Sequence, residues 1–199
     1  MHVYRYKHSG LIVGVDEAGR GPLAGPVYAA AVILPEDFTH PLLDDSKKIT
    51  YKKRLILRDF IIQAALSWAV ASIDNQEIDK INILNATIKA MHKALDRLNQ
   101  KPDLIIIDGN KFKKYKDIEH KTIVAGDSKY ACIAAASILA KTFRDEYMEQ
   151  IHKLYPQYNW LKNKGYGTFE HRQAILKYGL SPFHRKKFCT FYYQKKLNI

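Results

Sequence analysis

Apolar stretches of two kinds alternate along this chain. Short β-prone runs predict strands over residues 11–15, 27–34, 69–73, 103–109 and 122–125. Apolar residues at helical spacing predict helices over residues 51–68, with Thr50 as the N-cap, and over residues 83–98. An Ala-rich segment predicts a further helix that reaches about Tyr147 and is capped by Asp127 or Ser128. Because strands and helices alternate, the expected fold class is α/β, a sheet with helices packed on it.

The C-terminal segment has a different pattern, typical of short helices and loops. Turn-forming residues occur at Pro156, at residues 165–167 and at residues 181–182. The chain has no internal repeat and no linker long enough to separate two independent domains. We therefore expect an α/β core over residues 1–155 and a helical region over residues 156–199 that is not an independent domain.

Composition places the chain among globular proteins. Of its 199 residues, 47% are hydrophobic and 26% are charged, which excludes disordered and fibrous classes. The two cysteines, Cys132 and Cys189, form neither a disulfide framework nor a metal-binding spacing, so we expect a reducing, cytoplasmic compartment. The longest apolar run, residues 131–140 interrupted by Ser137, is shorter than the roughly 20 residues that a membrane span needs. With no secretion leader in the sequence either, we expect no membrane association.

Positive charge is concentrated in the second half of the chain. The formal net charge is +12, yet residues 1–110 contain 14 Lys and Arg against 13 Asp and Glu, so almost all of the excess follows residue 110. Basic residues there alternate with aromatic ones, as in the KFKKYK sequence of residues 111–116. This pattern favours binding to a phosphate backbone with stackable bases, and the simpler alternative is a solvated Lys-rich surface.

Acidic residues follow three of the apolar runs. Asp16 and Glu17 follow the first, and Asp108 and Asp127 follow the runs at 104–107 and 122–126. Carboxylates gathered at one sheet edge repel one another unless a cation compensates them, and an all-oxygen ligand set suits Mg²⁺ or Mn²⁺. Since neighbouring side chains on a strand face opposite sides, Asp16 and Glu17 can share a metal only if the first strand ends there, which the turn-forming residues 18–22 favour. The alternative is that Glu17 uses its backbone carbonyl or reaches a second ion. The alternative for each acid is a turn or helix-capping role.

Asp145 serves as a comparison for these acids. It lies 18 residues beyond Asp127, about 27 Å along a continuous helix, and therefore cannot join the same site. Lys141, four residues before it, offers an ordinary helix-surface ion pair.

An ordered series of segments resembles bacterial ribonuclease HII. The first is DEAGRGPLAGPV at residues 16–27. The others are DSKK at 45–48, NILNA at 82–86, IDGN at 107–110, GDSKY at 126–130, AAASILAK at 134–141, NKGYGT at 163–168 and SPFHR at 181–185. The resemblance covers roughly residues 11–188, and the Gly19-Arg20-Gly21 form is similar to type HII rather than to the sister type HIII.

The resemblance implies a ribonuclease H-like fold, in which a mixed five-stranded sheet flanked by helices forms the catalytic core and the small helical C-terminal region completes the substrate groove. It implies an endoribonuclease that hydrolyses the RNA strand of RNA·DNA hybrids and cuts 5′ to a ribonucleotide embedded in duplex DNA, leaving 5′-phosphate and 3′-hydroxyl ends. Such an enzyme serves ribonucleotide removal and the degradation of primer RNA. Asp16, Glu17, Asp108 and Asp127 are implied as catalytic, metal-binding carboxylates, with two Mn²⁺ or Mg²⁺ ions in the active complex.

The same resemblance implies how ribose is recognised. Gly19, Arg20 and Gly21 are similar to the segment whose backbone contacts the ribose 2′-hydroxyl, and Tyr166 is similar to the tyrosine that packs beside the sugar. The alternative for Tyr166 is a core-packing role. One departure from the pattern is Gly167, where many relatives have Pro, which leaves the strength of junction preference open.

Further substrate contacts are expected from residues in the matching segments. These residues are Ser46, Lys47, Asn85, His184 and Arg185. For Ser46, Lys47 and Asn85 the alternative is local turn and cap bonding, and for His184 it is a buried structural role.

A sliding clamp is a further possible partner of the C-terminal residues. The alternative is that these residues pack against the rest of the protein.

Two other functions fit parts of the sequence. A structure-specific nuclease would cut all-DNA junctions and ignore the 2′-hydroxyl, which the Gly19–Gly21 turn argues against. A non-catalytic nucleic-acid-binding module would show salt-sensitive binding without metal dependence. The strand-end acids argue against it, because they would weaken its binding to phosphate.

Overall fold

Five strands form one mixed sheet in the order β3-β2-β1-β4-β5. The computed structural model describes residues 3–43 and 50–190. Strand β2 (Val27–Ile33) pairs antiparallel with both β1 (Ile12–Ala18) and β3 (Ser67–Ile73), whereas β4 (Leu104–Asp108) runs parallel to β1 and to β5 (Glu119–Ile123). This arrangement confirms the predicted α/β class and the mixed five-stranded sheet.

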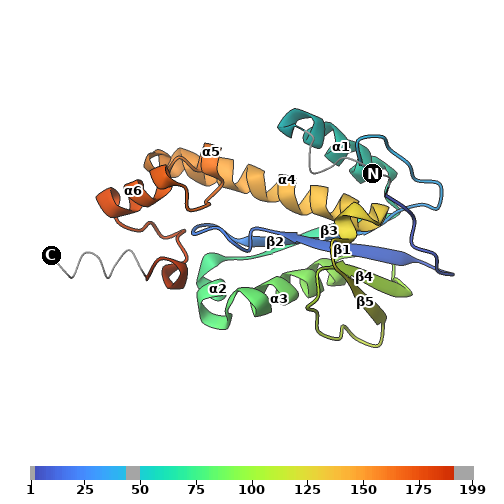
Figure 1. Cartoon of the computed structure of the whole chain (residues 1–199). Coiled ribbons are helices and arrows are strands. Elements are labelled where there is room, and N and C mark those ends of the chain that lie inside the picture. Colours follow the sequence, from blue (N-terminus) through green and yellow to red (C-terminus); the bar gives the residue numbers. More distant parts are fainter. Residues whose placement is uncertain (1–2, 44–49, 191–199) are drawn as a thin grey trace.

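Helices cover both faces of this sheet. Helices α1 (Tyr51–Ala64) and α4 (Ala131–Leu154) lie on one face, and α2 (Asn75–Ile81) and α3 (Ile83–Asp96) lie on the other (Figure 1). Along β1 the side chains alternate, with Val13 and Val15 in the cluster under α3 and Ile12 in a cluster with Ile133 of α4. Because both faces are buried, the central strands are apolar at nearly every position.

Several element boundaries differ from those predicted. Thr50 caps α1 as predicted, its hydroxyl accepting from the backbone N–H of Lys53 over 3.4 Å. The helix ends at Ala64 rather than at 68, because residues 67–73 pair with β2 along their whole length and sheet pairing overrides the helical pattern. Helix α4 runs past Tyr147 to Leu154. Within the described ranges no helix combines the length and apolarity needed to cross a bilayer.

The C-terminal elements pack around the second half of α4. They are η3 (Pro156–Tyr158), α5 (Trp160–Asn163), α6 (Phe169–Tyr178) and η4 (Lys186–Phe188), seen beyond the end of the sheet in Figure 1. Met148 and Ile151 of α4 share a buried cluster with Trp160 and Ile175. The region thus takes part of its core from α4, and the division at residue 155 stays a prediction.

Candidate active site

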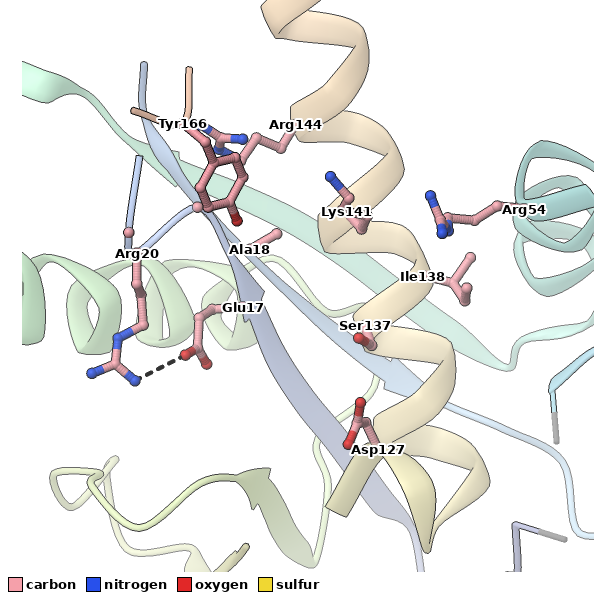
Figure 2. Close-up of a pocket in the computed structure, with 12 residues that line it drawn as sticks. Glu17, Ala18, Arg20, Arg54, Asp127, Ser137, Ile138, Lys141, Arg144 and Tyr166 are labelled. Atoms are coloured by element: carbon pink, nitrogen blue, oxygen red, sulfur yellow. Dashed lines mark hydrogen bonds and ion pairs between the residues drawn. The ribbon is translucent and has the colours of Figure 1, made fainter. Parts of the chain in front are cut away.

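A cavity of about 400 Å³ opens where β1 ends beside α4. Its walls come from segments far apart in the chain: the end of β1 and the turn after it, helices α1 and α4, the short helix η2 (Gly126–Ser128) and the loop that carries Tyr166 (Figure 2). The lining residues are Glu17, Ala18, Gly19, Arg20, Gly21, Arg54, Asp127, Ser137, Ile138, Lys141, Arg144 and Tyr166.

Asp16 lies under this cavity, inside strand β1. The expectation that the strand ends at Asp16 is wrong, because β1 continues to Ala18 in full register with β2. The Asp16 carboxylate accepts the backbone N–H of Glu17 over 2.7 Å and the hydroxyl of Ser137. Burial, together with the neighbouring charges of Glu17 and Asp108, raises its pKa well above the ordinary aspartate value.

Asp108 ends strand β4, directly beside Asp16. Strands β1 and β4 are parallel, and the pair Val15–Ile107 is the last in register before these two aspartates. One Asp108 oxygen accepts the backbone N–H of Gly126 over 2.6 Å. This bond ties the end of β4 to the turn that carries Asp127.

Glu17 faces away from Asp16 and toward the turn that follows β1. Its carboxylate pairs with the guanidinium of Arg20 over 3.2 Å (Figure 2). Burial raises the pKa of Glu17 and the nearby Asp108 charge raises it further, while Arg20 opposes both effects. Glu17 therefore lines the cavity from the side of the turn that follows β1.

Asp127 lies in η2 and lines the cavity near Ser137 (Figure 2). The prediction that Asp127 or Ser128 caps the long helix is wrong. Helix α4 begins at Ala131 after Tyr130, whose side chain makes no cap, and the Ser128 hydroxyl donates to the carbonyl of Ala125 instead. The intervening 3₁₀ turn leaves Asp127 directed at the cavity.

These four acids occupy one sheet edge and suit a hard divalent ion. Their donors are all oxygen, and the raised pKa values of Asp16 and Glu17 show that positive charge nearby would stabilise their ionised forms. Among residues 3–43 and 50–190, no three acidic, His or Cys side chains converge as a cage around one ion. Mg²⁺ is usually held by one or two carboxylates together with water and substrate phosphate, so this arrangement fits it without such a cage.

The wall opposite the acids is cationic, which the sequence analysis missed. Ser137, Lys141 and Arg144 succeed one another along one face of α4, and Arg54 of α1 lies across from them (Figure 2). Burial and the charges of Arg144 and Arg54 lower the pKa of Lys141, and its ion pair with Asp145, at 2.6 Å, opposes this shift. The pair expected between Lys141 and Asp145 is present, but Asp145 is buried, 3% exposed, rather than on the helix surface. The signal for this wall is the spacing of Ser137, Lys141 and Arg144 at i, i+4 and i+7, which places all three on one face of the helix.

Two buried arginines shape the turn between β1 and β2. Arg185 donates to the carbonyl oxygens of Gly19, Arg20 and Gly25 over 2.6, 2.9 and 2.9 Å. Arg144 donates to the carbonyls of Ala24 and Pro26 over 3.1–3.3 Å. Burial and the proximity of Arg144 lower the pKa of Arg185 to about 9, which leaves it charged at neutral pH. Gly19 has φ +97°, and a side chain there would meet Arg144.

Tyr166 stands at the cavity mouth, 46% exposed. Its ring lies 5.9 Å from the Arg144 guanidinium, and a Cβ at Gly21 would come within 3.7 Å of it. A core-packing role is therefore wrong for its ring. The neighbouring Gly167 packs against Leu23, so a side chain at this position would displace Leu23.

The remaining predicted contacts lie elsewhere. His184 and Arg185 are 1% and 0% exposed and bond to protein groups, so direct substrate contact is corrected to an interior role. The Asn85 side chain donates to the Ile81 carbonyl and accepts from Lys113, beside a separate hollow on α3. Ser46 and Lys47 fall outside the described residues.

Comparison with known proteins gives the same picture of fold and family. The family model for Ribonuclease HII matches residues 13–191. A ribonuclease HII of Bacteroides thetaiotaomicron is 58% identical over 175 residues, which make up 88% of either chain.

Solved structures share the fold at low sequence identity. The ribonuclease H2 of Pyrococcus horikoshii OT3 superposes with a TM-score of 0.81 at 23% identity, covering 95% of this chain and all of that one. The ribonuclease HII of Archaeoglobus fulgidus, solved as a complex with PCNA, has a TM-score of 0.77 at 22% identity and covers 88% and 93%. Bst-RNase HIII in complex with Mn²⁺ has a TM-score of 0.69 at 19% identity and covers 92% and 70%.

Several of the segments that carry the family likeness lie at or beside the cavity: the end of β1, the end of β4, η2, α4 and the Tyr166 loop. The chain belongs to the ribonuclease HII family, metal-dependent endonucleases that act on RNA·DNA hybrids.

Proposed function

We propose that this enzyme also cuts duplex DNA on the 5′ side of a single embedded ribonucleotide, using two divalent ions and leaving 5′-phosphate and 3′-hydroxyl ends. One observation carries the proposal: the acids at the sheet edge and the candidate ribose-binding groups share a single cavity. Glu17 and Asp127 line it together with Gly19, Gly21 and Tyr166. A phosphate placed at the acids thus has its neighbouring sugar within reach of the turn and the tyrosine.

Asp16, Glu17, Asp108 and Asp127 are the residues that would hold the ions. Bound ions would supply an activated water and stabilise the charge that develops on the phosphorane and on the leaving oxygen. The protein holds Asp16 through the Ser137 hydroxyl and Asp108 through the Gly126 N–H. These bonds orient the carboxylates before substrate arrives.

Ribose is distinguished by the turn at Gly19–Gly21. Telling ribose from deoxyribose requires groups that bond the 2′-hydroxyl, and backbone amides and carbonyls can do this where no side chain obstructs them. Arg185 fixes the carbonyls of Gly19 and Arg20 from beneath. The Tyr166 ring offers a flat face against the sugar, which rejects a wrong neighbour by shape.

The cationic wall serves the rest of the strand. Arg54, Lys141 and Arg144 face the acids across the cavity. Phosphates on either side of the scissile one meet positive charge there, while the scissile one faces the acids.

Cleavage of matched duplexes tests the proposal. The substrates are a duplex with one ribonucleotide, its all-DNA counterpart and an RNA·DNA hybrid, each with Mg²⁺, Mn²⁺ or chelator. We expect a single cut 5′ to the ribonucleotide, no cut in the all-DNA duplex, and no activity with chelator. Cleavage of the all-DNA duplex, or cleavage of the hybrid alone, would contradict it.

Asp108→Asn tests the carboxylate assignment. Metal-assisted stabilisation is worth several kcal/mol, so kcat should fall at least about 100-fold while binding measured by fluorescence anisotropy persists. Asp117→Asn is the matched control, since Asp117 is an exposed acid paired with Lys114 outside the cavity. An Asp108→Asn enzyme that cuts at the unaltered rate would remove Asp108 from the site.

A further inference from the structure

A buried pair of histidines lies behind the Tyr166 loop, outside the cavity. His171 of α6 is 0% exposed and His184 is 1% exposed, and both pack against the indole of Trp160. Neither histidine belongs to the acidic edge or to the cationic wall. Their polar contacts nevertheless lead from the interior to the cavity mouth.

The hydrogen bonds of this pair determine where its protons lie. Trp160 Nε1 can only donate, and it donates to His171 Nε2 over 3.1 Å. His171 therefore carries its proton on Nδ1, which lies 2.9 Å from the Tyr166 carbonyl oxygen and donates to it. His184 Nε2, 3.1 Å from the same His171 nitrogen, must also be a donor.

The contacts of His184 with Ser181 agree with a proton on His184 Nε2. With its proton on Nε2, His184 has an acceptor at Nδ1. The backbone N–H and the hydroxyl of Ser181 both lie 2.9 Å from this nitrogen. A continuous relay thus runs from Ser181 through His184 and His171 to the Tyr166 carbonyl.

Both rings are neutral in this relay. Burial lowers the pKa of His171, and burial together with the neighbouring His171 lowers the pKa of His184 to about 3. A second proton on His171, at Nε2, would face the N–H donors of Trp160 and His184, and a second proton on His184, at Nδ1, would face the backbone N–H of Ser181. Charged residues adjoin both histidines: Glu170 and Arg172 flank His171 in α6, with Arg172 donating to the Gly167 carbonyl over 2.8 Å, and Arg185 follows His184. Asp79 accepts the backbone N–H of Lys186 over 2.7 Å.

The adjacent residues His184 and Arg185 therefore support the two parts of the proposed ribose site, Tyr166 and the Gly19–Gly21 turn. His184 reaches Tyr166 through His171, and Arg185 bonds the carbonyls of Gly19 and Arg20. The strand-like bridge between Ala24 and His184, with the Arg185 N–H donating to the Leu23 carbonyl over 2.8 Å, fixes this dipeptide to the same turn. One short segment thereby sets the spacing between Tyr166 and the glycine turn.

We infer that His171 and His184 are positioning residues for ribose selection: their relay holds the Tyr166 backbone so that its ring stays in register with the Gly19–Gly21 turn. The inference rests on the proposed cleavage at single ribonucleotides. It names residues that never touch substrate yet set how well the enzyme tells a lone ribonucleotide from a continuous RNA strand.

Two substitutions at His171 separate this role from simple core packing. The amide of an asparagine takes the place of Nδ1, so His171→Asn keeps a donor for Tyr166 and gives up the bonds to Trp160 and His184. The amide of a glutamine takes the place of Nε2, so His171→Gln keeps the interior bonds and removes the side-chain donor to the Tyr166 carbonyl, which then keeps only the bond from the backbone N–H of Thr168 over 2.8 Å. The readout is the ratio of kcat/KM on the single-ribonucleotide duplex to kcat/KM on the hybrid, with thermal unfolding measured alongside.

We expect His171→Gln to lower this ratio about tenfold, the size of one lost positioning hydrogen bond, and His171→Asn to change it less than about threefold. In a Tyr166→Ala background the effect of His171→Gln on the ratio should disappear, because both changes then act through the same ring. A core-packing role alone would make the two variants follow their stabilities and would leave the ratio unchanged.

Each outcome decides a separate point. If the unaltered enzyme does not cut the single-ribonucleotide duplex, the proposed function falls and this inference falls with it. If it does cut and the ratio is unchanged in His171→Gln, only the positioning role is overturned. Should the histidine variants not fold, Ser181→Ala removes the hydroxyl bond to His184 and the bond that this oxygen accepts from the Phe183 N–H over 3.2 Å, while the Ser181 backbone N–H still donates to His184. A lowered ratio then supports the relay, whereas an unchanged one overturns it.

Discussion

The guanidinium of Arg185 donates a hydrogen bond of 2.6 Å to the carbonyl oxygen of Gly19, a residue 166 positions earlier in the chain. Two further bonds from the same group reach the carbonyls of Arg20 and Gly25. A planar, five-donor group can satisfy three such acceptors at once. The turn that faces the substrate is therefore supported from inside the C-terminal region.

Arg185→Lys should destabilise the enzyme. A lysine keeps the charge but cannot reproduce the fork, so buried carbonyls lose their donors at a cost of about 2–3 kcal/mol, or about 4–12 °C in Tm. Thermal unfolding measures this. Arg97→Lys is the control, because Arg97 also donates to a backbone carbonyl, that of Val70, but at an exposed position. Equal losses in the two variants would contradict a special role for Arg185.

Gly19→Ala should be far more damaging than Gly109→Ala. The two glycines have nearly the same φ, +97° and +94°, so the backbone strain of about 1–2 kcal/mol is common to both. At Gly19 the added methyl group also meets Arg144 and the Pro26 carbonyl, whereas nothing lies within 4 Å at Gly109. Urea denaturation of both variants measures the difference, and a Gly19→Ala protein as stable as Gly109→Ala would refute it.

Local patterns predicted the strands and helices better than their ends. The apolar runs at β1, β2 and β4 were sufficient to identify a buried sheet, and Thr50 marked a true helix start. Tertiary pairing moved the start of β3 back to Ser67, which no local signal indicates.

Some residues of the candidate site could be predicted from local sequence, and others depend on tertiary packing. The acids follow apolar runs and are visible in the sequence, as is the exposed tyrosine beside glycines. Arg54 and Arg144 are not, because their place at the cavity depends on how α1 and α4 pack. The interior roles of His184 and Arg185 likewise depend on contacts with residues more than 10 positions away.

Asp16→Asn should stabilise the metal-free enzyme while abolishing cleavage. Because the pKa of Asp16 is raised in the fold, the folded state binds the proton more tightly, and stability falls as pH rises from the ordinary carboxyl value through the raised one. A neutral amide removes that cost. Thermal unfolding at pH 5 and pH 8 in chelator should show a smaller loss of Tm in the variant.

Metal should offset the loss of stability that ionised Asp16 causes at high pH in the unaltered enzyme. Adding Mn²⁺ at pH 8 is expected to raise its Tm, since an ion that binds only the folded state stabilises it by mass action. The Asp16→Asn protein should respond much less. An equal response in both would place the ion elsewhere.

Acid should destabilise the fold through His184. Its pKa is lowered to about 3, so below the ordinary value of 6.5 the unfolded chain takes up a proton that the folded chain does not. Stability present at pH 7 is therefore lost as pH falls, by about 2 kcal/mol between pH 7 and pH 5. His184→Gln should reduce this pH dependence and His8→Gln, at an exposed position, should not. Chemical denaturation at the two pH values decides between them.

Helix α4 runs without interruption from Ala131 to Leu154 and touches every part of the site in turn. Ser137 binds Asp16, Arg144 holds the turn after β1, and Met148 packs beneath Gly165 next to Tyr166. Each residue inserted into a helix advances the remainder of that helix by about 1.5 Å and rotates it by about 100°. Between Ser137 and Arg144 this enzyme can therefore accept no insertion or deletion, because a single one would move Arg144 and Met148 out of register with Ser137 and so separate the sugar-binding turn from the acids.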